Sequence, residues 1–469
     1  MKTTRKQFVE GLAAIATAGS HAACAHVAAE PLLRLGIVSD LHHTTRDDGT
    51  RGQNCLCIEP ALRYFDVRRA DGIIVCGDLS DFGTVASLHE LGAMWDRVFP
   101  CGRRSDGEPI AKLMHYGDHE MSTLMQNPKY RKWALEVSSD PDELNHFILD
   151  YGPGKAWEES FHEKWAPIQV KTVKGYTFVL AHHPVHTTES NNGNRIPGLA
   201  EFLKALKLDP NKPFFYSQHR HFEVGDTAEV LASYPNVIAL HGHLHMNCVD
   251  ELSLTQERFV KISVPSLNYC GTRYWRENSR QLFPEALLKA VDCSKSWQGL
   301  FASVYADRIV VERRDFLNGL PLGYDWVIPL PTPNDGLIRD VRAKRSVPPQ
   351  FAPDARVTVS ERIGNNRKHV PVEQVLLRFP VAHATGSALR AYDYEVTASA
   401  GGKALKTRAV FSQGCYWADE KDVLPVECPF AKSELPRDWR TTVSFTVKPR
   451  DAFGNCGKPI IFSARNMQG

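Results

Sequence analysis

Two features are missing from this chain, and each absence excludes a class of protein. Beyond residue 29 there is no apolar run long enough to cross a lipid bilayer, so no transmembrane helix is expected. Neither charge sign dominates, because 56 Lys and Arg residues nearly balance 54 Asp and Glu residues and leave a net charge of +2. No whole-chain attraction to nucleic acid or to an anionic membrane is therefore expected, and an anionic substrate must be attracted locally.

The first 29 residues predict an export signal. Basic residues precede a small apolar run over residues 11–19, and small residues suited to cleavage follow. Residues 5–9, Arg-Lys-Gln-Phe-Val, are similar to a twin-arginine signal with lysine at the second basic position. We expect a periplasmic or secreted protein. The alternatives are a cytosolic protein with a frayed N-terminus and a lipoprotein anchored at Cys24.

The chain has 11 cysteines, and of these only Cys24 lies in the predicted signal. An oxidising compartment would permit disulfides among the others, but their pairing does not follow from the sequence. Cys55 and Cys57 are consistent with a disulfide, with buried thiols or with a soft-metal site, and these alternatives stay open.

A chain of 469 residues is longer than one hydrophobic core usually fills, so we expect two domains. Between residues 30 and 330, short apolar runs alternate with stretches of helical spacing, which predicts a layered α/β domain. Residues 331–347 are rich in proline and charge and predict a linker. Residues 348–469 have alternating short strands, which predict a small all-β sandwich of fibronectin type III or immunoglobulin-like shape.

The predicted strands of the α/β domain are apolar and bounded by polar or turn residues. They span residues 32–38, 72–76, 111–116, 176–181, 213–217 and 237–240. The predicted helices span residues 58–69, 85–98, 199–206 and 227–234. In the sandwich, strands are predicted over residues 355–360, 375–379, 392–397 and 442–447.

Aspartate and histidine residues gather where these strands end. In chain order they are Asp40, His42, Asp78, Asp118, His219, His243 and His245. Open α/β sheets bind ligands at the carboxyl ends of their strands, so these side chains are expected to converge. A glycine precedes Asp78, Asp118 and His243, which permits a sharp turn and a close approach to an ion. Mixed imidazole and carboxylate ligands favour Zn, Fe or Mn over Ca or Mg.

Taken in order, these blocks resemble the signature of calcineurin-like metallophosphoesterases over residues 32–330. The blocks are Asp40-x-His42, Gly77-Asp78, Gly117-Asp118-His119-Glu120, a strand-terminal histidine and Gly242-His243-x-His245. The resemblance implies a two-sheet layered α/β domain flanked by helices. The ligand set that it implies is one metal ion on Asp40, His42 and His245, a second on Asp118, His219 and His243, and Asp78 bridging them.

The resemblance also implies an activity, the hydrolysis of a small phosphate monoester or diester. Two divalent or mixed-valence ions of Mn, Fe or Zn would activate a hydroxide for in-line attack on phosphorus and neutralise the developing charge. His119 would be the catalytic residue that protonates the leaving oxygen or orients the substrate.

The histidine of the fourth block has two candidates. His182-His183 begins a segment similar to the His-His-Pro block of the family, whereas His219 follows residues 211–213 and an apolar strand. We assign the block to His219, because a further strand and the Gly-His-x-His segment follow closely. His182, His183 and His221 then either line the substrate pocket or belong to surface loops.

Asp118 departs from the family pattern, in which asparagine is usual. A carboxylate at this position adds a negative charge to a site that must attract an anionic phosphate. We therefore expect tighter metal binding or a preference for a more highly charged ion. The segment after Asp78 also lacks the tyrosine of purple acid phosphatases, which disfavours that subgroup.

The alternative function is a periplasmic or surface binding protein that keeps this fold without catalysis. In that case the sandwich would contact a glycan or a protein partner. Tyr392, Tyr394, Phe445 and Phe453 are consistent with a sugar-binding face, but their strand spacing favours the sandwich core. The complete set of metal-ligand residues favours the enzyme.

Overall fold

The computed structural model describes most of the chain. The described residues are 30–44, 56–121, 127–129, 131–132, 147–185, 195–222, 226–271, 276–279, 285–291, 296–384, 390–412 and 424–463. The predicted export signal, residues 1–29, lies outside them. Within these ranges, no helix combines the length and the apolar character needed to cross a bilayer.

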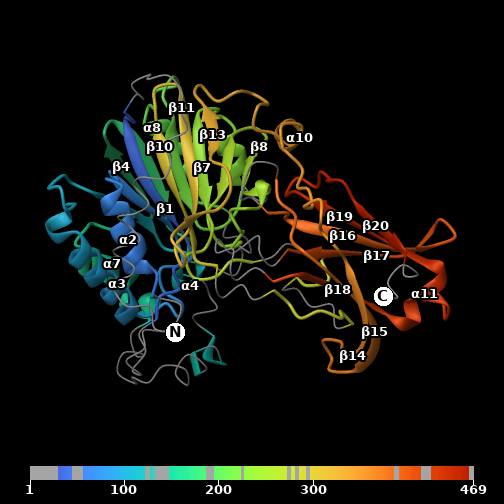
Figure 1. The fold of residues 1–469 in the computed structure, drawn as a ribbon. Coiled ribbons are helices and arrows are strands. Elements are labelled where there is room, and N and C mark those ends of the chain that lie inside the picture. The colour runs from blue at the N-terminus through green and yellow to red at the C-terminus, as the bar shows by residue number, and fades with distance from the viewer. Residues whose placement is uncertain are drawn as a thin grey trace.

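The larger part of the molecule contains two β-sheets (Figure 1). The strands are β1 Leu33–Val38, β2 Gly72–Cys76, β3 Ala111–His115, β4 Ile168–Val173, β5 Tyr176–Ala181, β6 Phe214–Gln218, β7 Val237–His241, β8 Leu254–Gln256, β9 Val260–Ser263, β10 Gln298–Val304, β11 Arg308–Asp315, β12 Leu320–Pro321 and β13 Trp326–Pro329. The first sheet has the order β12-β11-β10-β1-β2-β3, with β13 also on β11, and the second has the order β4-β5-β6-β7-β9-β8.

The central strands of both sheets are parallel. β1 pairs with β2 and β2 with β3, and in the second sheet β5, β6, β7 and β9 follow one another in the same way. Most residues of these strands are apolar because both faces of a covered parallel sheet are buried; β2, Gly-Ile-Ile-Val-Cys, is buried throughout. Parallel pairing brings the carboxyl ends of neighbouring strands to one edge, which is where a ligand site is expected.

Apolar side chains join the two sheets and attach the helices. The shared core contains Leu35, Ile74 and Leu240, so it draws on both sheets. A second core packs α2 Ile58–Val67, α3 Val85–Val98 and α7 Pro153–Phe161 against the first sheet, and a third packs α8 Leu199–Ala205 and α9 Asp226–Leu231 against the second. At the start of α3, the Thr84 side chain accepts a hydrogen bond from the Ser87 amide, which satisfies a backbone donor that the helix leaves open.

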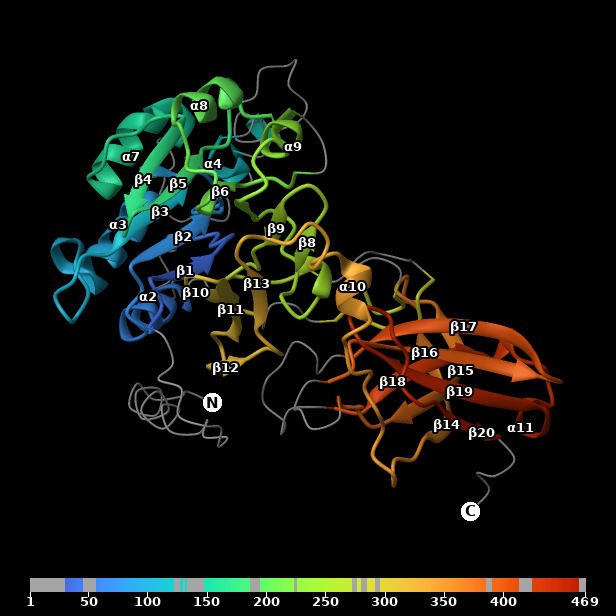
Figure 2. The same ribbon diagram turned by 90° about the horizontal axis from the view of Figure 1, so that it is seen from above.

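The C-terminal part is a sandwich of two antiparallel sheets (Figure 2). One sheet contains β14 Thr358–Asn365, β15 Pro371–Phe379 and β18 Val426–Ala431; the other contains β16 Asp393–Ala400, β17 Lys403–Phe411, β19 Val443–Arg450 and β20 Ile460–Ser463. Tyr394 and Phe445 are fully buried between the sheets, so they are core residues. The predicted fold class, a two-sheet α/β region followed by a β-sandwich, is confirmed.

The sequence did not predict the structure of residues 331–347, which include the helix α10, Arg339–Ala343. Arg342 of α10 donates hydrogen bonds to the carbonyl oxygens of Glu251 (2.9 Å) and Leu254 (2.6 Å). The proposed linker is therefore attached to the two-sheet region. The domain boundaries at residues 330 and 348 stay predictions.

A polar and aromatic joint connects the sandwich to the two-sheet region. Tyr392, at the start of β16, belongs to the core cluster of the two sheets, and its hydroxyl donates to Asp250 Oδ2 at 2.8 Å. Arg276 and Arg450 both pair with Asp393, at 2.7 and 2.6 Å. Because Tyr392 and Asp250 are 4% and 2% exposed, their hydrogen bond is shielded from water.

We predict that Tyr392→Phe destabilises the chain by about 1–3 kcal/mol, because the buried Asp250 carboxylate loses a hydrogen-bond donor. Urea unfolding followed by fluorescence measures this change. Tyr305→Phe is the matched control, since the Tyr305 hydroxyl forms no hydrogen bond with a described residue. Equal stability of the two variants would contradict the role of the joint.

Candidate metal centre

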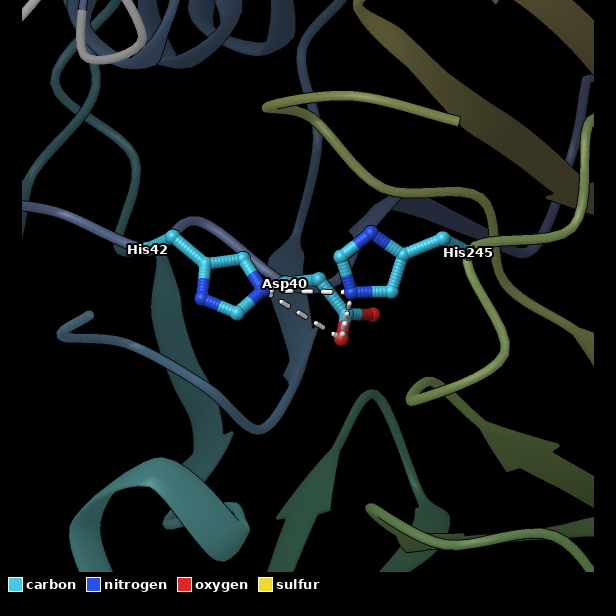
Figure 3. Close-up of side chains that lie close together, drawn as sticks. All are labelled: Asp40, His42 and His245. Atoms are coloured by element: carbon cyan, nitrogen blue, oxygen red, sulfur yellow. Dashed lines mark hydrogen bonds and ion pairs between the residues drawn. The ribbon is translucent and has the colours of Figure 1, made fainter. Parts of the chain in front are cut away.

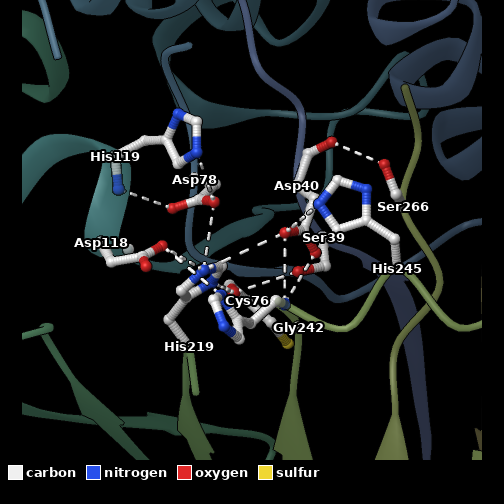
Figure 4. A network of polar contacts seen from close by, with 12 residues as sticks. Ser39, Asp40, Cys76, Asp78, Asp118, His119, His219, Gly242, His245 and Ser266 are labelled. Atoms are coloured by element: carbon white, nitrogen blue, oxygen red, sulfur yellow. Dashed lines mark hydrogen bonds and ion pairs between the residues drawn. The ribbon is translucent and has the colours of Figure 1, made fainter. Parts of the chain in front are cut away.

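The seven aspartate and histidine residues from the strand ends meet at one edge of the paired sheets. Figure 4 labels Asp40, Asp78, Asp118, His219 and His245 among them. Asp40 and His42 follow β1, and Asp78 follows β2. Asp118 begins α4, Asp118–Met121, just after β3, and His219 directly follows β6; His243 and His245 follow β7. The first sheet thus supplies the carboxylates and His42, while the second supplies the other imidazoles. Neither sheet alone could form the cluster.

Asp40, His42 and His245 form the first group (Figure 3). His245 Nε2 lies 3.0 Å from Asp40 Oδ1 and 3.1 Å from His42 Nε2, and His42 Nε2 lies 3.9 Å from Asp40 Oδ1. One donor atom from each residue lies within 4.8 Å of the others. This spacing suits three ligands of one metal ion.

Asp118, His219 and His243 form the second group under the same distance limit. Asp118 Oδ1 lies 3.0 Å from His219 Nε2 and 3.6 Å from His243 Nδ1. Asp78 lies between the groups, because its Oδ2 is 3.1 Å from His219 Nε2 and 3.8 Å from His42 Nε2. Asp78 also has metal-ligand spacing with His42 and His119 and with Asp40 and His219, so this carboxylate connects the two groups.

The charge and the unsatisfied polar atoms of this cluster are suited to metal ions. Asp40 is fully buried, Asp78 is 1% exposed and Asp118 is 9% exposed, and a buried carboxylate is costly unless it is paired or coordinates a metal. Asp118 Oδ1 and His219 Nε2 are buried and face each other at 3.0 Å, but within the described residues neither atom has a hydrogen bond of good angular geometry. Burial opposes ionisation of Asp40, but His245, His219 and His42 lower the pKa of its carboxyl well below the usual range.

Hydrogen bonds on the side facing away from the cluster orient the histidine rings. Nδ1 of His219 donates to the Cys76 carbonyl oxygen at 2.8 Å, and Nδ1 of His245 donates to that of Tyr269 at 2.9 Å. His42 Nδ1 contacts Asp81 Oδ1 at 3.0 Å. With Nδ1 occupied in each ring, Nε2 points into the cluster as a ligand atom.

The backbone of the cluster is strained. Five of the seven residues have a positive φ: Asp40 (50°), His42 (45°), Asp78 (50°), His243 (67°) and His245 (48°). Non-glycine residues rarely adopt this conformation, and it costs about 1–3 kcal/mol for each residue. Such strain is maintained by the surrounding structure; for example, the amides of Asp40 and His42 donate to the carbonyl oxygens of Gly77 and Asp78 at 3.1 and 3.0 Å.

Two glycines allow the close approach of the strand-end loops. A Cβ atom on Gly117 would lie 2.1 Å from Asp78 Oδ1, and one on Gly242 would lie 1.9 Å from Ser39 Oγ and 2.6 Å from Asp40 Oδ2. Any side chain at either position would displace a carboxylate of the cluster. This is the physical requirement behind the Gly-Asp and Gly-His patterns.

We predict that Gly242→Ala releases metal and destabilises the chain by about 1–3 kcal/mol, because the added methyl group overpacks the loop against Asp40. Metal content per chain, measured by mass spectrometry after gel filtration, tests this. Gly271→Ala is the control, since its Cβ would meet no heavy atom closer than 3.5 Å. Equal metal content in the two variants would argue against the steric requirement.

His119 lies beside the shared carboxylate. Its amide donates to Asp78 Oδ1 at 3.0 Å, and its Nδ1 donates to the Asp81 carbonyl oxygen at 2.7 Å. Its Nε2 lies 3.9 Å from Asp78 Oδ2, and its side chain is 30% exposed. Burial disfavours the imidazolium, but Asp78, Asp118 and Asp81 outweigh that effect and raise the pKa of His119 to about 9.

The other predicted histidines have different surroundings. His182 accepts a hydrogen bond from the Tyr116 amide at 3.0 Å and contacts the Trp157 ring, so it belongs to the interior. The ring of His183 lies 6.5 Å from that of His219, and His221 lies 6.5 Å from His243. Among the described residues, none of the three belongs to a group with metal-ligand spacing. Substrate binding by them stays a prediction.

Sequence reasoning missed several residues that support the cluster. Arg220 donates to Asp118 Oδ2 at 2.7 Å, which offsets the additional negative charge of that carboxylate. Glu120 accepts hydrogen bonds from the amides of Ser80 (2.6 Å) and Gly117 (2.7 Å) and so ties two strand-end loops together. Arg220 directly follows His219, and Glu120 lies inside the Gly-Asp-His-Glu block, but the sequence alone gives neither residue a partner.

Comparisons with known proteins find similarity only at the level of structure. No protein-family model matches the chain, and no curated protein matches it. A dimetal phosphatase from Danio rerio matches with 13% identity and a TM-score of 0.36, over 64% of this chain and 100% of that chain. A predicted phosphoesterase from Streptococcus pneumoniae matches with 10% identity and a TM-score of 0.27, over 63% and 97%.

A third solved structure contains zinc. The Vps29 protein from Entamoeba histolytica, complexed with Zn²⁺, matches with 8% identity and a TM-score of 0.27, over 63% of this chain and 99% of that chain. Because all three TM-scores lie below 0.5, we infer function from the side chains of the cluster.

Proposed function

We propose that this protein is a metal-dependent hydrolase of phosphate monoesters or diesters. The observation that carries the proposal is the pair of three-residue ligand groups with the Asp78 carboxylate lying between them. The sequence blocks that resemble calcineurin-like metallophosphoesterases support it. We also propose Mn, Fe or Zn as the metals, and a location outside the cytoplasm on the strength of the predicted export signal.

The residues of the chain have distinct roles in this reaction. Asp40, His42 and His245 would hold one ion, Asp118, His219 and His243 the other, and Asp78 both. Such a pair of ions supplies Lewis acidity and positive charge to a phosphate ester. The hydrogen bonds from His42, His219 and His245 to outer acceptors keep the ligand atoms in place, so little reorganisation accompanies the reaction.

His119 is positioned to donate a hydrogen bond or transfer a proton. Its Nδ1 is fixed on the Asp81 carbonyl oxygen, which leaves Nε2 facing the cluster beside Asp78. In this position Nε2 can donate a hydrogen bond to a phosphate oxygen or a proton to the leaving oxygen. The partial exposure of the ring lets a substrate reach it.

We predict that metal removal lowers ester hydrolysis by more than about 100-fold. The substitution Asp78→Asn should have an effect of the same size, because the ligand groups on both sides depend on this carboxylate. p-Nitrophenyl phosphate and bis(p-nitrophenyl) phosphate are suitable substrates, tested with protein loaded with Mn, Fe or Zn and with chelated protein. Asp307→Asn, a change at an exposed carboxylate outside the cluster, serves as the control. Fully loaded protein that cleaves neither ester would instead favour the binding-protein alternative.

We predict that Arg220→Met raises KM about tenfold while metal content is retained, because the Asp118 charge then repels the anionic substrate. Asp118→Asn alone should weaken metal binding, since one carboxylate charge is lost. The double variant restores the charge balance and should recover substrate affinity, with a coupling of about 1 kcal/mol or more. Steady-state kinetics and metal analysis of all four proteins measure the coupling; strictly additive effects would contradict it.

A further inference from the structure

A cleft lies where the two-sheet region, α10 and the sandwich meet, and Figure 2 shows α10 between the two bodies. Its volume is about 570 Å³, within the range of about 300–1,000 Å³ typical of ligand pockets. The aromatic and arginine residues of its lining include Tyr324, Trp326, Arg342, Arg345, Tyr392 and Phe453. None of the lining residues belongs to the metal-ligand groups. The cleft is therefore a separate candidate site.

The lining of the cleft favours an anion. Four arginines line it, Arg313, Arg342, Arg345 and Arg390, against the carboxylates Glu251, Asp325 and Asp451. Glu251 already pairs with Arg313 at 2.8 Å and with Arg342. Asp451 is engaged in its own loop, where its Oδ1 accepts the amides of Phe453 (2.9 Å) and Asn455 (2.8 Å). The four guanidinium groups outnumber the three carboxylates of the lining by one positive charge.

Arg345 is the guanidinium best placed to meet that ligand. It is exposed, and its side chain forms no ion pair with any carboxylate in the described part of the chain. Arg313 and Arg342, in contrast, are held by Glu251 and by backbone carbonyl oxygens. The cleft thus combines a fixed wall with a charged group that is available at its rim.

The apolar surface of the cleft is also partly open. Tyr324 is 54% exposed, and Val327 and Val347 are each 50% exposed. Trp326, which also lines the cleft, is fixed by its indole N–H, which donates to Glu251 Oε2 at 3.0 Å, and by Arg313, whose guanidinium lies 4.9 Å from its ring centroid. A cleft lined by an exposed tyrosine and an exposed arginine suits a ligand with one flat apolar face and one anionic group.

We propose that this cleft binds an acidic saccharide of one or two sugar rings. The C–H face of a sugar ring lies on Tyr324, the carboxylate pairs with Arg345, and the hydroxyl groups meet the polar side chains of the lining. Residues from both bodies contribute, so binding also strengthens the joint between them. This proposal does not depend on phosphoester hydrolysis at the metal centre.

Titration calorimetry of the metal-loaded full chain tests the proposal, with digalacturonate as the acidic probe, maltose as the neutral saccharide and benzoate as a carboxylate without sugar. We expect digalacturonate to bind at least tenfold more tightly than either other probe. Arg345→Gln and Tyr324→Ala should each weaken its binding at least tenfold. Arg356→Gln, at an exposed arginine outside the cleft, is the control and should leave binding unchanged.

Several results would overturn the proposal. Equal affinity for maltose and digalacturonate would remove the role of the charge, and equal affinity for benzoate would remove the role of the sugar. Digalacturonate binding that survives both Arg345→Gln and Tyr324→Ala would place the probe elsewhere, including at the metal centre. Absence of digalacturonate binding by the wild-type chain would reject the site directly.

Discussion

The Asp78 carboxylate at the centre of the cluster is the constraint on which the arrangement of the two sheets depends. It lies 3.1 Å from a histidine of the second sheet and 3.8 Å from one of the first, at 1% exposure. A negative charge so far from water requires positive partners on every side. The facing sheets bring imidazoles from β6 and β7 to carboxylates from β1, β2 and β3, so the same apposition that buries the core also assembles the cluster.

The backbone strain of the cluster lies in the loops that follow the strands. Five of its residues have positive φ, and two neighbouring glycines are packed so closely that no side chain could replace their hydrogen. Hydrogen bonds from the rings of His42, His219 and His245 to a carbonyl or carboxylate oxygen fix these three rings in place. Rigid strands below and outer hydrogen bonds around the rings together maintain a geometry that an isolated loop would not adopt.

The sandwich and the two-sheet region are packed together, because Tyr392 and Phe411 belong to the core cluster of the two sheets. Asp393 pairs with Arg450 within the sandwich and with Arg276 from the chain segment that precedes β10. The cleft beside this joint has walls from both bodies. A ligand there and a substrate at the metal centre would therefore be bound by one connected framework.

The sequence alone predicted the fold class and most central strands. A buried strand must be apolar, and Gly72–Cys76 and Tyr176–Ala181 lie where that pattern placed them. The helix Val85–Val98 was likewise predicted with its observed ends, since helical spacing is a local signal. In the two-sheet region the strands β4 and β8 to β13 were missed, and so was the helix α10.

The sequence also determined which residue types stand at the strand ends, because Gly-Asp and His-x-His are contiguous patterns. Only the tertiary structure decided which of them meet. It brought His219 into the cluster and left His182 among aromatic rings, and it joined Asp118 to Arg220. The joint between the sandwich and the two-sheet region, and the cleft beside it, were likewise decided only by the tertiary structure. These contacts depend on the register between sheets and on packing between residues far apart in the chain, and no local pattern encodes either.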